Sequence, residues 1–299
     1  MRRAFPGSVA SVAYPWVVSL YQMDDPGDLI APSLVAAFDG WVDSGSAATT
    51  ALASLASGAR VVARFDADRL FDYRARRPTL DIVDGRLTEI VWSELVLSAT
   101  RIGERDLLIL TGAEPDYRWR EFADAVMELA RQLGVAEWIS LGAIPAAVPH
   151  TRPVPILGTA SEPGLLRGGI KPGPLGRLRV PAALVSVLEL ELSRTGIPAV
   201  GYFAQVPHYV SGPYPSAALE LLRSLGRHLG LALPEGDLPD ESNQLRIHLD
   251  SLATGDAQTR AYVERLESMV DEERQPSGDD LIEEIERFLR DGGTENSQR

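Results

Sequence analysis

The sequence predicts an α/β protein, a three-layer α/β/α sandwich with a mostly parallel sheet. Short apolar runs alternate with longer stretches of helical spacing, and such alternation is typical of strands joined by helices that cross one face of a sheet. Hydrophobic residues make up 45% of the 299 positions, and a chain of this length buries about three quarters of its unfolded surface. A core of this size is therefore expected to be stable without disulfide bonds.

The alternating elements follow one another along residues 1–232. Residues 161–181 hold many Gly and Pro without any period, so we expect a surface loop there. The apolar runs typical of buried strands are Ile30–Phe38, Arg60–Phe65, Asp106–Leu110, Glu137–Leu141, Val154–Leu157 and Ala199–Ala204. The stretches with helical spacing, each with a glycine at or soon after its end, are Ser46–Ser57, Trp119–Leu133, Ala182–Arg194 and Pro215–Leu229.

Two segments depart from the alternation. Thr79–Trp92 has two runs of alternating apolar and polar residues around Asp84-Gly85, which predicts a β-hairpin as an insertion in the chain or as a sheet edge. After about Pro234 the strand patterns stop and charged helical patterns follow, the last of them at residues 279–290 before a frayed tail. We therefore predict a core domain over residues 1–232 and a C-terminal helical segment over residues 233–299.

Composition excludes several classes of function. The net charge is −13, and an acidic chain repels both nucleic acid and anionic membranes, so we expect neither as a partner. There is no cysteine, so thiol catalysis and thiolate metal sites are excluded. Lys171 is the only lysine and lies in a Gly/Pro-rich stretch, so we expect no nucleotide cofactor. The N-terminal stretch fits neither a signal peptide nor a membrane span, which indicates a cytoplasmic protein.

The loops that follow the predicted strands define a candidate cleft. In an open parallel sheet, ligands bind at the carboxyl ends of the strands, where these loops converge. Together their polar and aromatic side chains could hold a polar ligand. The candidates are Asp39, Trp41, Asp43, Glu114, His150, Gln205, His208 and Tyr214.

The acidic turn within this set has two interpretations. Asp43 precedes a predicted helix and is well placed to cap it, with Trp41 as a packing residue, because Asp and Ser are preferred at helix starts. Alternatively, Asp39 and Asp43 could join His150 or His208 around a divalent metal ion. No metal-binding spacing such as HExxH accompanies them, so a cap is favoured and no metal is predicted.

A second candidate is the segment just before the predicted hairpin, where three arginines follow a tyrosine. Planar guanidinium groups suit an anion-binding site or a contact between subunits. Ordinary surface pairing with Asp66, Asp68 or Asp72 is the alternative, since the chain has a surplus of acids. The residues concerned are Tyr73, Arg74, Arg76 and Arg77.

Several motifs in series resemble the proteasome assembly chaperone 2 family, in its long actinobacterial and uncharacterised branch. They are "AFDGWVDSGSAATTAL", "RFDADRLFDYRARRP", "ISLGAIPAAVPHTRPVPILGTAS" and "GYFAQVPHYVSGPYPSAALELL", and the likeness runs from about residue 30 to residue 230. The resemblance implies a fold similar to phosphorylase/hydrolase-like proteins and assembly into a homo-oligomer. It also implies, from archaeal and eukaryotic relatives, that proteasome α-subunits are a protein partner.

The function predicted from the sequence is therefore protein binding of the assembly-chaperone type, without an enzymatic activity. The alternative is a small-molecule hydrolase- or phosphorylase-like enzyme, or a ligand-binding protein, that uses the cleft at the carboxyl ends of the strands. No catalytic group is assigned, because neither histidine is accompanied by a nucleophile elbow around a serine.

Overall fold

Four parallel strands form the centre of the sheet. The computed structural model describes residues 19–274. β2 (Ser33–Asp39) pairs in parallel with β7 (Arg105–Ala113) on one side and with β8 (Glu137–Ala146) on the other, and β10 (Ala199–Pro207) pairs in parallel with β8. Nearly all of β2 is buried, which explains why its sequence is a continuous apolar run rather than an alternating one.

Antiparallel strands extend this block at both edges. β6 (Leu95–Ile102), β3 (Arg60–Phe65) and β1 (Tyr21–Met23) continue the sheet beyond β7, while β9 (Ile156–Ala160) closes the other edge beside β10. The order is β1-β3-β6-β7-β2-β8-β10-β9. β3 points the same way as the four central strands, so the sheet is mixed but mostly parallel.

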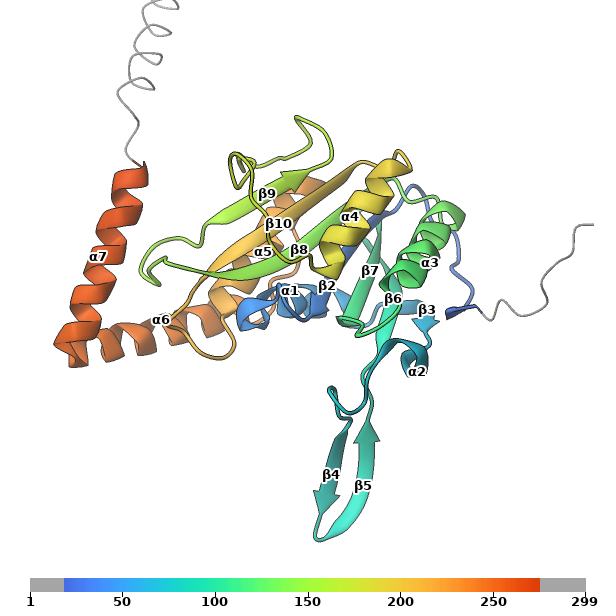
Figure 1. Ribbon diagram of the computed structural model, residues 1–299, viewed down its shortest axis with the longest axis horizontal. Coiled ribbons are helices and arrows are strands. Elements are labelled where there is room, and N and C mark those ends of the chain that lie inside the picture. The colour runs from blue at the N-terminus through green and yellow to red at the C-terminus, as the bar shows by residue number, and fades with distance from the viewer. Residues whose placement is uncertain (1–18, 275–299) are drawn as a thin grey trace, which may run out of the picture.

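Helices cover both faces of the sheet, which confirms the predicted three-layer sandwich (Figure 1). α1 (Ala47–Ala56) and α5 (Pro215–Leu229) pack on one face, and α3 (Trp119–Gln132) and α4 (Leu184–Arg194) pack on the other. Two short helical turns lie in the connections, η1 (Ser44–Ser46) and α2 (Ala67–Leu70).

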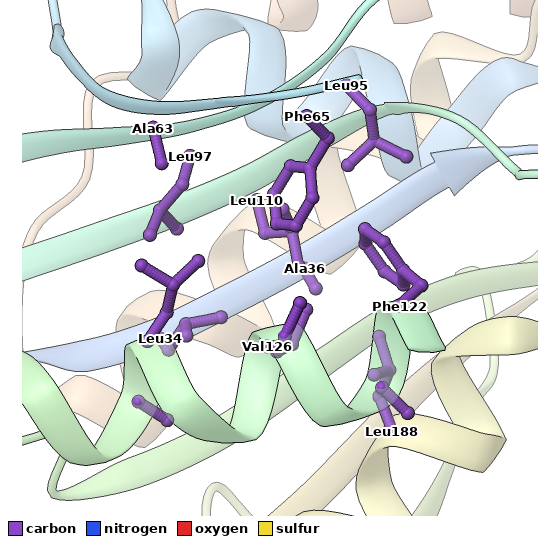
Figure 2. Packing of buried hydrophobic residues seen from close by; sticks show 14 of the residues in the cluster. Leu34, Ala36, Ala63, Phe65, Leu95, Leu97, Leu110, Phe122, Val126 and Leu188 are labelled. Carbon is purple, nitrogen blue, oxygen red and sulfur yellow. The ribbon is translucent and has the colours of Figure 1, made fainter. Parts of the chain in front are cut away.

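The core between the sheet and α3 is built from large side chains that interlock. Figure 2 shows Phe122 and Val126 of α3 beside Leu34 and Ala36 of β2, with Phe65 on the neighbouring part of the sheet. The rings of Phe65 and Phe122 have centroids 4.7 Å apart, a distance typical of aromatic pairs in cores. This packing fixes α3, the helix that follows β7, against β2 and the neighbouring strands.

The predicted hairpin is confirmed and projects away from the sandwich (Figure 1). β4 (Thr79–Val83) and β5 (Arg86–Val91) are joined by Asp84 and Gly85, whose φ angles are 50° and 75°. Two consecutive positive φ values define the type I′ turn that Asp-Gly favours. Every residue of both strands is exposed.

Two long helices follow the sandwich. α6 (Leu238–Gly255) packs against α5, and α7 (Ala257–Arg274) follows it. Within residues 19–274, no helix combines the length and the apolar composition that crossing a bilayer requires. The predicted helical stretch at residues 279–290 and the predicted tail lie outside the described residues, and the domain division after residue 232 stays a prediction.

A buried polar network ties the end of α5 to the start of β8. Glu137 accepts a hydrogen bond from the Ser33 hydroxyl at 2.6 Å, and its other oxygen lies 3.1 Å from Nε2 of His228. The Tyr202 hydroxyl lies 2.7 Å from Nδ1 of the same histidine. The bond with His228, helped by Ser33 against the opposing effect of burial, lowers the pKa of Glu137 to about 2.

The stability of the protein should depend on the ionisation of Glu137. Its folded pKa of about 2 lies below the ordinary value of 4.5, so the ionised carboxylate stabilises the fold above about pH 4.5. We expect Glu137→Gln to lower the free energy of unfolding by about 2–3 kcal/mol at pH 7, with the difference shrinking as the pH falls from 4.5 toward 2. Urea unfolding at several pH values measures this.

The matched control is Glu191→Gln, because Glu191 forms an i,i+3 pair with Arg194 on the surface of α4. This variant should change the free energy of unfolding by less than about 0.5 kcal/mol. A constant difference between wild type and Glu137→Gln across the pH range would contradict the role assigned to the carboxylate.

Candidate functional site

Asp43 holds the first turn of α1. Its side chain is 8% exposed, and Oδ1 accepts hydrogen bonds from the backbone N–H groups of Ala48 at 2.7 Å and Thr49 at 3.3 Å. Oδ2 accepts from the Thr49 hydroxyl. Burial raises the pKa of Asp43 despite these donors. The carboxylate thus already accepts hydrogen bonds from the N–H groups that would otherwise bind an anion at this helix start.

Tyr214 lies against the same turn. The N–H of Tyr214 donates to the carbonyl of Gly45 at 2.9 Å, and a Cβ at Gly45, whose φ is 64°, would lie 2.8 Å from Cβ of Tyr214. Only glycine therefore fits this position without a local shift. Tyr214 is almost fully buried, and burial raises its pKa to about 12. The ring supports the turn rather than lining an open cleft.

Asp39 and Arg76 join the two predicted candidate segments. Nη1 of Arg76 lies 3.0 Å from Oδ2 of Asp39, so this arginine pairs with the acidic turn and not with Asp66, Asp68 or Asp72. A crevice of about 620 Å³ lies beside the pair, between α1 and the ends of β2 and β7. β2 is followed by α1 on one face of the sheet, whereas its neighbour β7 is followed by α3 on the other face. Ligands of α/β proteins bind at such a point, where the connections of adjacent strands leave in opposite directions.

Glu114 connects the acidic turn to α4. Its Oε1 accepts from the N–H of Leu184, the first residue of α4, at 2.7 Å, and its Oε2 accepts from the N–H of Trp41 at 3.4 Å. The Trp41 side chain itself is 68% exposed. Glu114 is thus engaged by two backbone groups, while the indole is left on the surface.

His150 and His208 lie together at the ends of β8 and β10. Both imidazole rings make edge contacts with the ring of Tyr209, with centroids 5.8 Å apart in each case. His150 is buried, its Nδ1 lies 2.7 Å from the Tyr209 hydroxyl, and its Nε2 lies 3.3 Å from Oδ1 of Asp250 on α6. Asp250 and Tyr209 therefore fix the orientation of the ring.

His208 is exposed and contacts α7. Its Nδ1 lies 2.9 Å from the carbonyl oxygen of Ala146, which can only accept, so Nδ1 carries the proton. Its Nε2 lies 2.8 Å from the hydroxyl of Tyr262 on α7. Gln205 belongs to β10 nearby, and its backbone N–H donates to the carbonyl of Pro155 at 3.0 Å.

Sequence reasoning did not select the three residues that contact the histidines, Tyr209, Asp250 and Tyr262. Tyr209 directly follows His208 and belongs to the same turn, so its position was a usable signal. Asp250 and Tyr262 lie on α6 and α7, 100 and 54 residues from the histidines that they contact. Nothing in the helical pattern indicates that these faces turn toward the carboxyl ends of β8 and β10.

The rest of the arginine-rich segment lies at the base of the hairpin. The Tyr73 hydroxyl donates to Oδ1 of Asp68 at 2.7 Å, and its ring lies 4.8 Å from that of Trp92, so the pair closes the base of the hairpin. Burial, followed by the bond to Asp68, raises the pKa of Tyr73 to about 12. The side chains of Arg74 and Arg77 are exposed.

The residues from 19 to 274 contain no group of three or more His, Asp or Glu side chains arranged to hold a metal ion. Asp43 is directed at α1, Asp39 at Arg76, and His150 at Tyr209 and Asp250. The geometry thus favours the capping interpretation of the acidic turn, and the cleft as a whole stays a prediction.

Comparison with known proteins places the chain in a family. A model described as the PAC2 family matches residues 37–253. The chain belongs to the PAC2 family. This confirms the resemblance predicted from the motifs. No curated protein matches the chain.

Solved structures of PAC2 relatives share the fold along most of the chain. A Streptomyces avermitilis PAC2 family protein is 38% identical, with 78% of this chain and 99% of that chain covered and a TM-score of 0.70. A Mycobacterium tuberculosis proteasome-assembly chaperone homologue is 35% identical, with 77% and 99% covered and a TM-score of 0.70. A second M. tuberculosis protein, of unknown function, is 30% identical, with 97% and 96% covered and a TM-score of 0.80.

The capping role of Asp43 predicts a loss of stability on its removal. We expect Asp43→Ala to lower the free energy of unfolding by about 1–2 kcal/mol, because the N–H groups of Ala48 and Thr49 lose their acceptor. Asp43→Asn should lose less, since an amide oxygen still accepts these bonds. Chemical unfolding measures both variants, with the exposed Asp124→Ala as the control. Equal stability of Asp43→Ala and wild type would contradict the assignment.

Proposed function

We propose that this PAC2 family protein is a non-enzymatic, protein-binding protein of the assembly-chaperone type, and that it acts in the cytoplasm as a homo-oligomer. The observation that carries the proposal is the exposed hairpin with the arginine-rich segment at its base, residues 73–92, which we call the arm. Membership of the PAC2 family supports the chaperone-like role, as does the likeness to a proteasome-assembly chaperone homologue.

The arm carries an apolar face that this chain leaves in water. Leu80 lies opposite Ile90 and Ile82 lies opposite Leu87, so the four side chains share one face of the hairpin, and they are 42–70% exposed. A two-stranded hairpin is only marginally stable alone, and apolar patches of this kind mark contacts with other proteins. Because the arm points away from its own sandwich, its partner must be another molecule (Figure 1).

Charge favours a second copy of this chain as that partner. The arm contains four arginines and three acidic residues, a net charge of +1, whereas the whole chain carries −13. The rest of the molecule is therefore strongly acidic and attracts the arm of a neighbouring copy. We propose that the contact is reciprocal or closes a ring, since either geometry generates a closed oligomer of identical subunits.

Proteasome α-subunits are the proposed protein partner. The support is the family resemblance, together with the description of a 35% identical relative as a proteasome-assembly chaperone homologue. An oligomer of PAC2 subunits would present several identical surfaces to an assembling complex, which suits a chaperone better than a single copy would.

Removing the apolar face of the arm should dissociate the oligomer. The variant Leu80→Ser/Ile82→Ser/Leu87→Ser/Ile90→Ser should weaken self-association by at least ~10³-fold, because four aliphatic side chains lose their burial. Light scattering coupled to size exclusion measures the mass. The control is Leu175→Ser/Leu178→Ser, which replaces two exposed leucines outside the arm and should keep the wild-type mass. A wild-type monomer, or an unchanged mass in the quadruple variant, contradicts the proposal.

A second candidate function is small-molecule binding or turnover in a crevice at the carboxyl ends of the strands. The crevice of about 620 Å³ beside Asp39 and Arg76 favours it. One experiment separates the two candidates: crosslinked capture of the tagged protein from its own cytosol, with native mass spectrometry of the same sample.

We expect proteasome α-subunits in fixed ratio to the captured protein, and we expect Arg74→Glu/Arg77→Glu, at the exposed base of the arm, to reduce the captured amount several-fold. Asp39→Asn is the control and should capture as much as wild type. A homo-oligomer that carries a metabolite released by Asp39→Asn, without a protein partner, would overturn the chaperone assignment in favour of the second candidate.

A further inference from the structure

A large cavity lies between the C-terminal helices and the sandwich. Its volume is about 800 Å³, within the range of small-molecule sites. α6 and α7 meet at an angle beyond one end of the sheet (Figure 1), and the cavity fills this angle up to His150 and Tyr209, which follow β8 and β10. This cavity is separate from the crevice beside Asp39. A ligand bound in it would be a function in addition to the protein binding proposed above.

One side of the cavity is apolar and comes from both helices. Such a wall accepts a hydrocarbon or aromatic body rather than a polar one, because it offers no hydrogen bonds. Leu252 is 55% exposed although it is a large aliphatic residue, so ligand atoms at this place would remove apolar surface from water. The wall consists of Leu249, Leu252, Ala253, Ala261 and Val263.

The acidic and hydroxyl groups around the cavity are already engaged by the protein. Asp250 accepts from His150, and Asp256 accepts from the backbone N–H of Thr259 at 2.7 Å and from its hydroxyl at 2.5 Å. The Tyr209 oxygen accepts from the backbone N–H of His150 at 2.8 Å and bonds to the ring of the same residue. A ligand amine would therefore have to displace existing bonds in order to find a carboxylate.

Arg265 is the side chain at the cavity that is suited to bind a charged ligand. Its Cζ lies 4.9 Å from the centroid of the Tyr262 ring, which holds the guanidinium plane at the cavity. No carboxylate pairs with Arg265 among residues 19–274, in contrast to Arg152, which pairs with Glu267 and Asp271 nearby. A guanidinium with free donors is suited to the two oxygens of a carboxylate.

We propose that this cavity binds an amphiphilic monocarboxylic acid, with its carboxylate on Arg265 and its apolar body against Leu249, Leu252 and Val263. One negative charge fits and two do not, because α6 and α7 together carry eight acidic residues and four arginines. An ion pair at an exposed arginine contributes little, so the apolar body supplies most of the affinity. Affinity then rises about tenfold for two added methylene groups.

Calorimetry with straight-chain probes tests the proposal. Sodium decanoate, below its micelle-forming concentration, should bind the full chain in a 1:1 ratio and about tenfold tighter than octanoate. Arg265→Gln should weaken decanoate at least threefold. 1-Decanol, which has the same apolar body without the charge, should bind wild type at least threefold more weakly than decanoate and should be unaffected by Arg265→Gln. Decylamine should bind more weakly than decanoate despite the negative net charge of the chain.

Two further variants make the result decisive. Arg246→Gln is the matched control, because Arg246 is an exposed arginine of α6 that contacts Asn243 and does not line the cavity; it should leave decanoate binding unchanged. Leu252→Ser should weaken decanoate and leave the oligomer mass as in wild type. No saturable decanoate binding, equal binding of decanol or decylamine, or an equal effect of Arg246→Gln and Arg265→Gln would overturn the proposal. None of these outcomes bears on the arm.

Discussion

The rest of the structure depends on the burial of β2 between β7 and β8. A strand covered by helices on both faces carries a polar side chain along its length only where that side chain is hydrogen-bonded within the protein, as Ser33 is to Glu137, so groups free to meet a ligand are displaced to the point where the strand ends. Asp39 and Asp43 are the first carboxylates after the run from Ser33 to Phe38, and their surroundings differ. Asp39 faces Arg76 and solvent, whereas Asp43 turns inward to α1.

The same constraint explains how much of the fold could be predicted from the sequence. The central strands are continuous apolar runs, and the predicted β3, α3 and α5 match the structure to within a residue at either end. β6 escaped because Leu95–Ile102 passes from an apolar to a polar half and follows the hairpin without a turn signal. β1 is three residues long, which is too short to show a period.

The candidate site was predictable only where its partners are local. The preference of aspartate for helix starts predicts that Asp43 caps α1, and its carboxylate accepts from the N–H groups five and six residues on. The short turn η1, which places Ser46 directly before α1, was not predicted. The pairing of Asp39 with Arg76 spans 37 residues, and that of Arg152 with Asp271 spans 119. Local periodicity carries no information on such pairs, because they arise only once the sheet has brought the strand ends and the helices together.

α7, which forms one wall of the cavity, is attached to the sandwich largely by contacts near the surface. Val263, Leu266 and Val270 are buried, and several of the other contacts are polar and near the surface, such as His208 with Tyr262 and Arg152 with Asp271. Exposed ion pairs contribute less than about 1 kcal/mol each, so α7 is held more weakly than the helices of the sandwich. A ligand bound between α6 and α7 buries apolar surface of both helices at the place where α7 is attached. Its binding therefore stabilises the docked position of α7, and a partner that contacts the outer face of α7 is coupled to that ligand to the extent that the partner prefers this position of the helix.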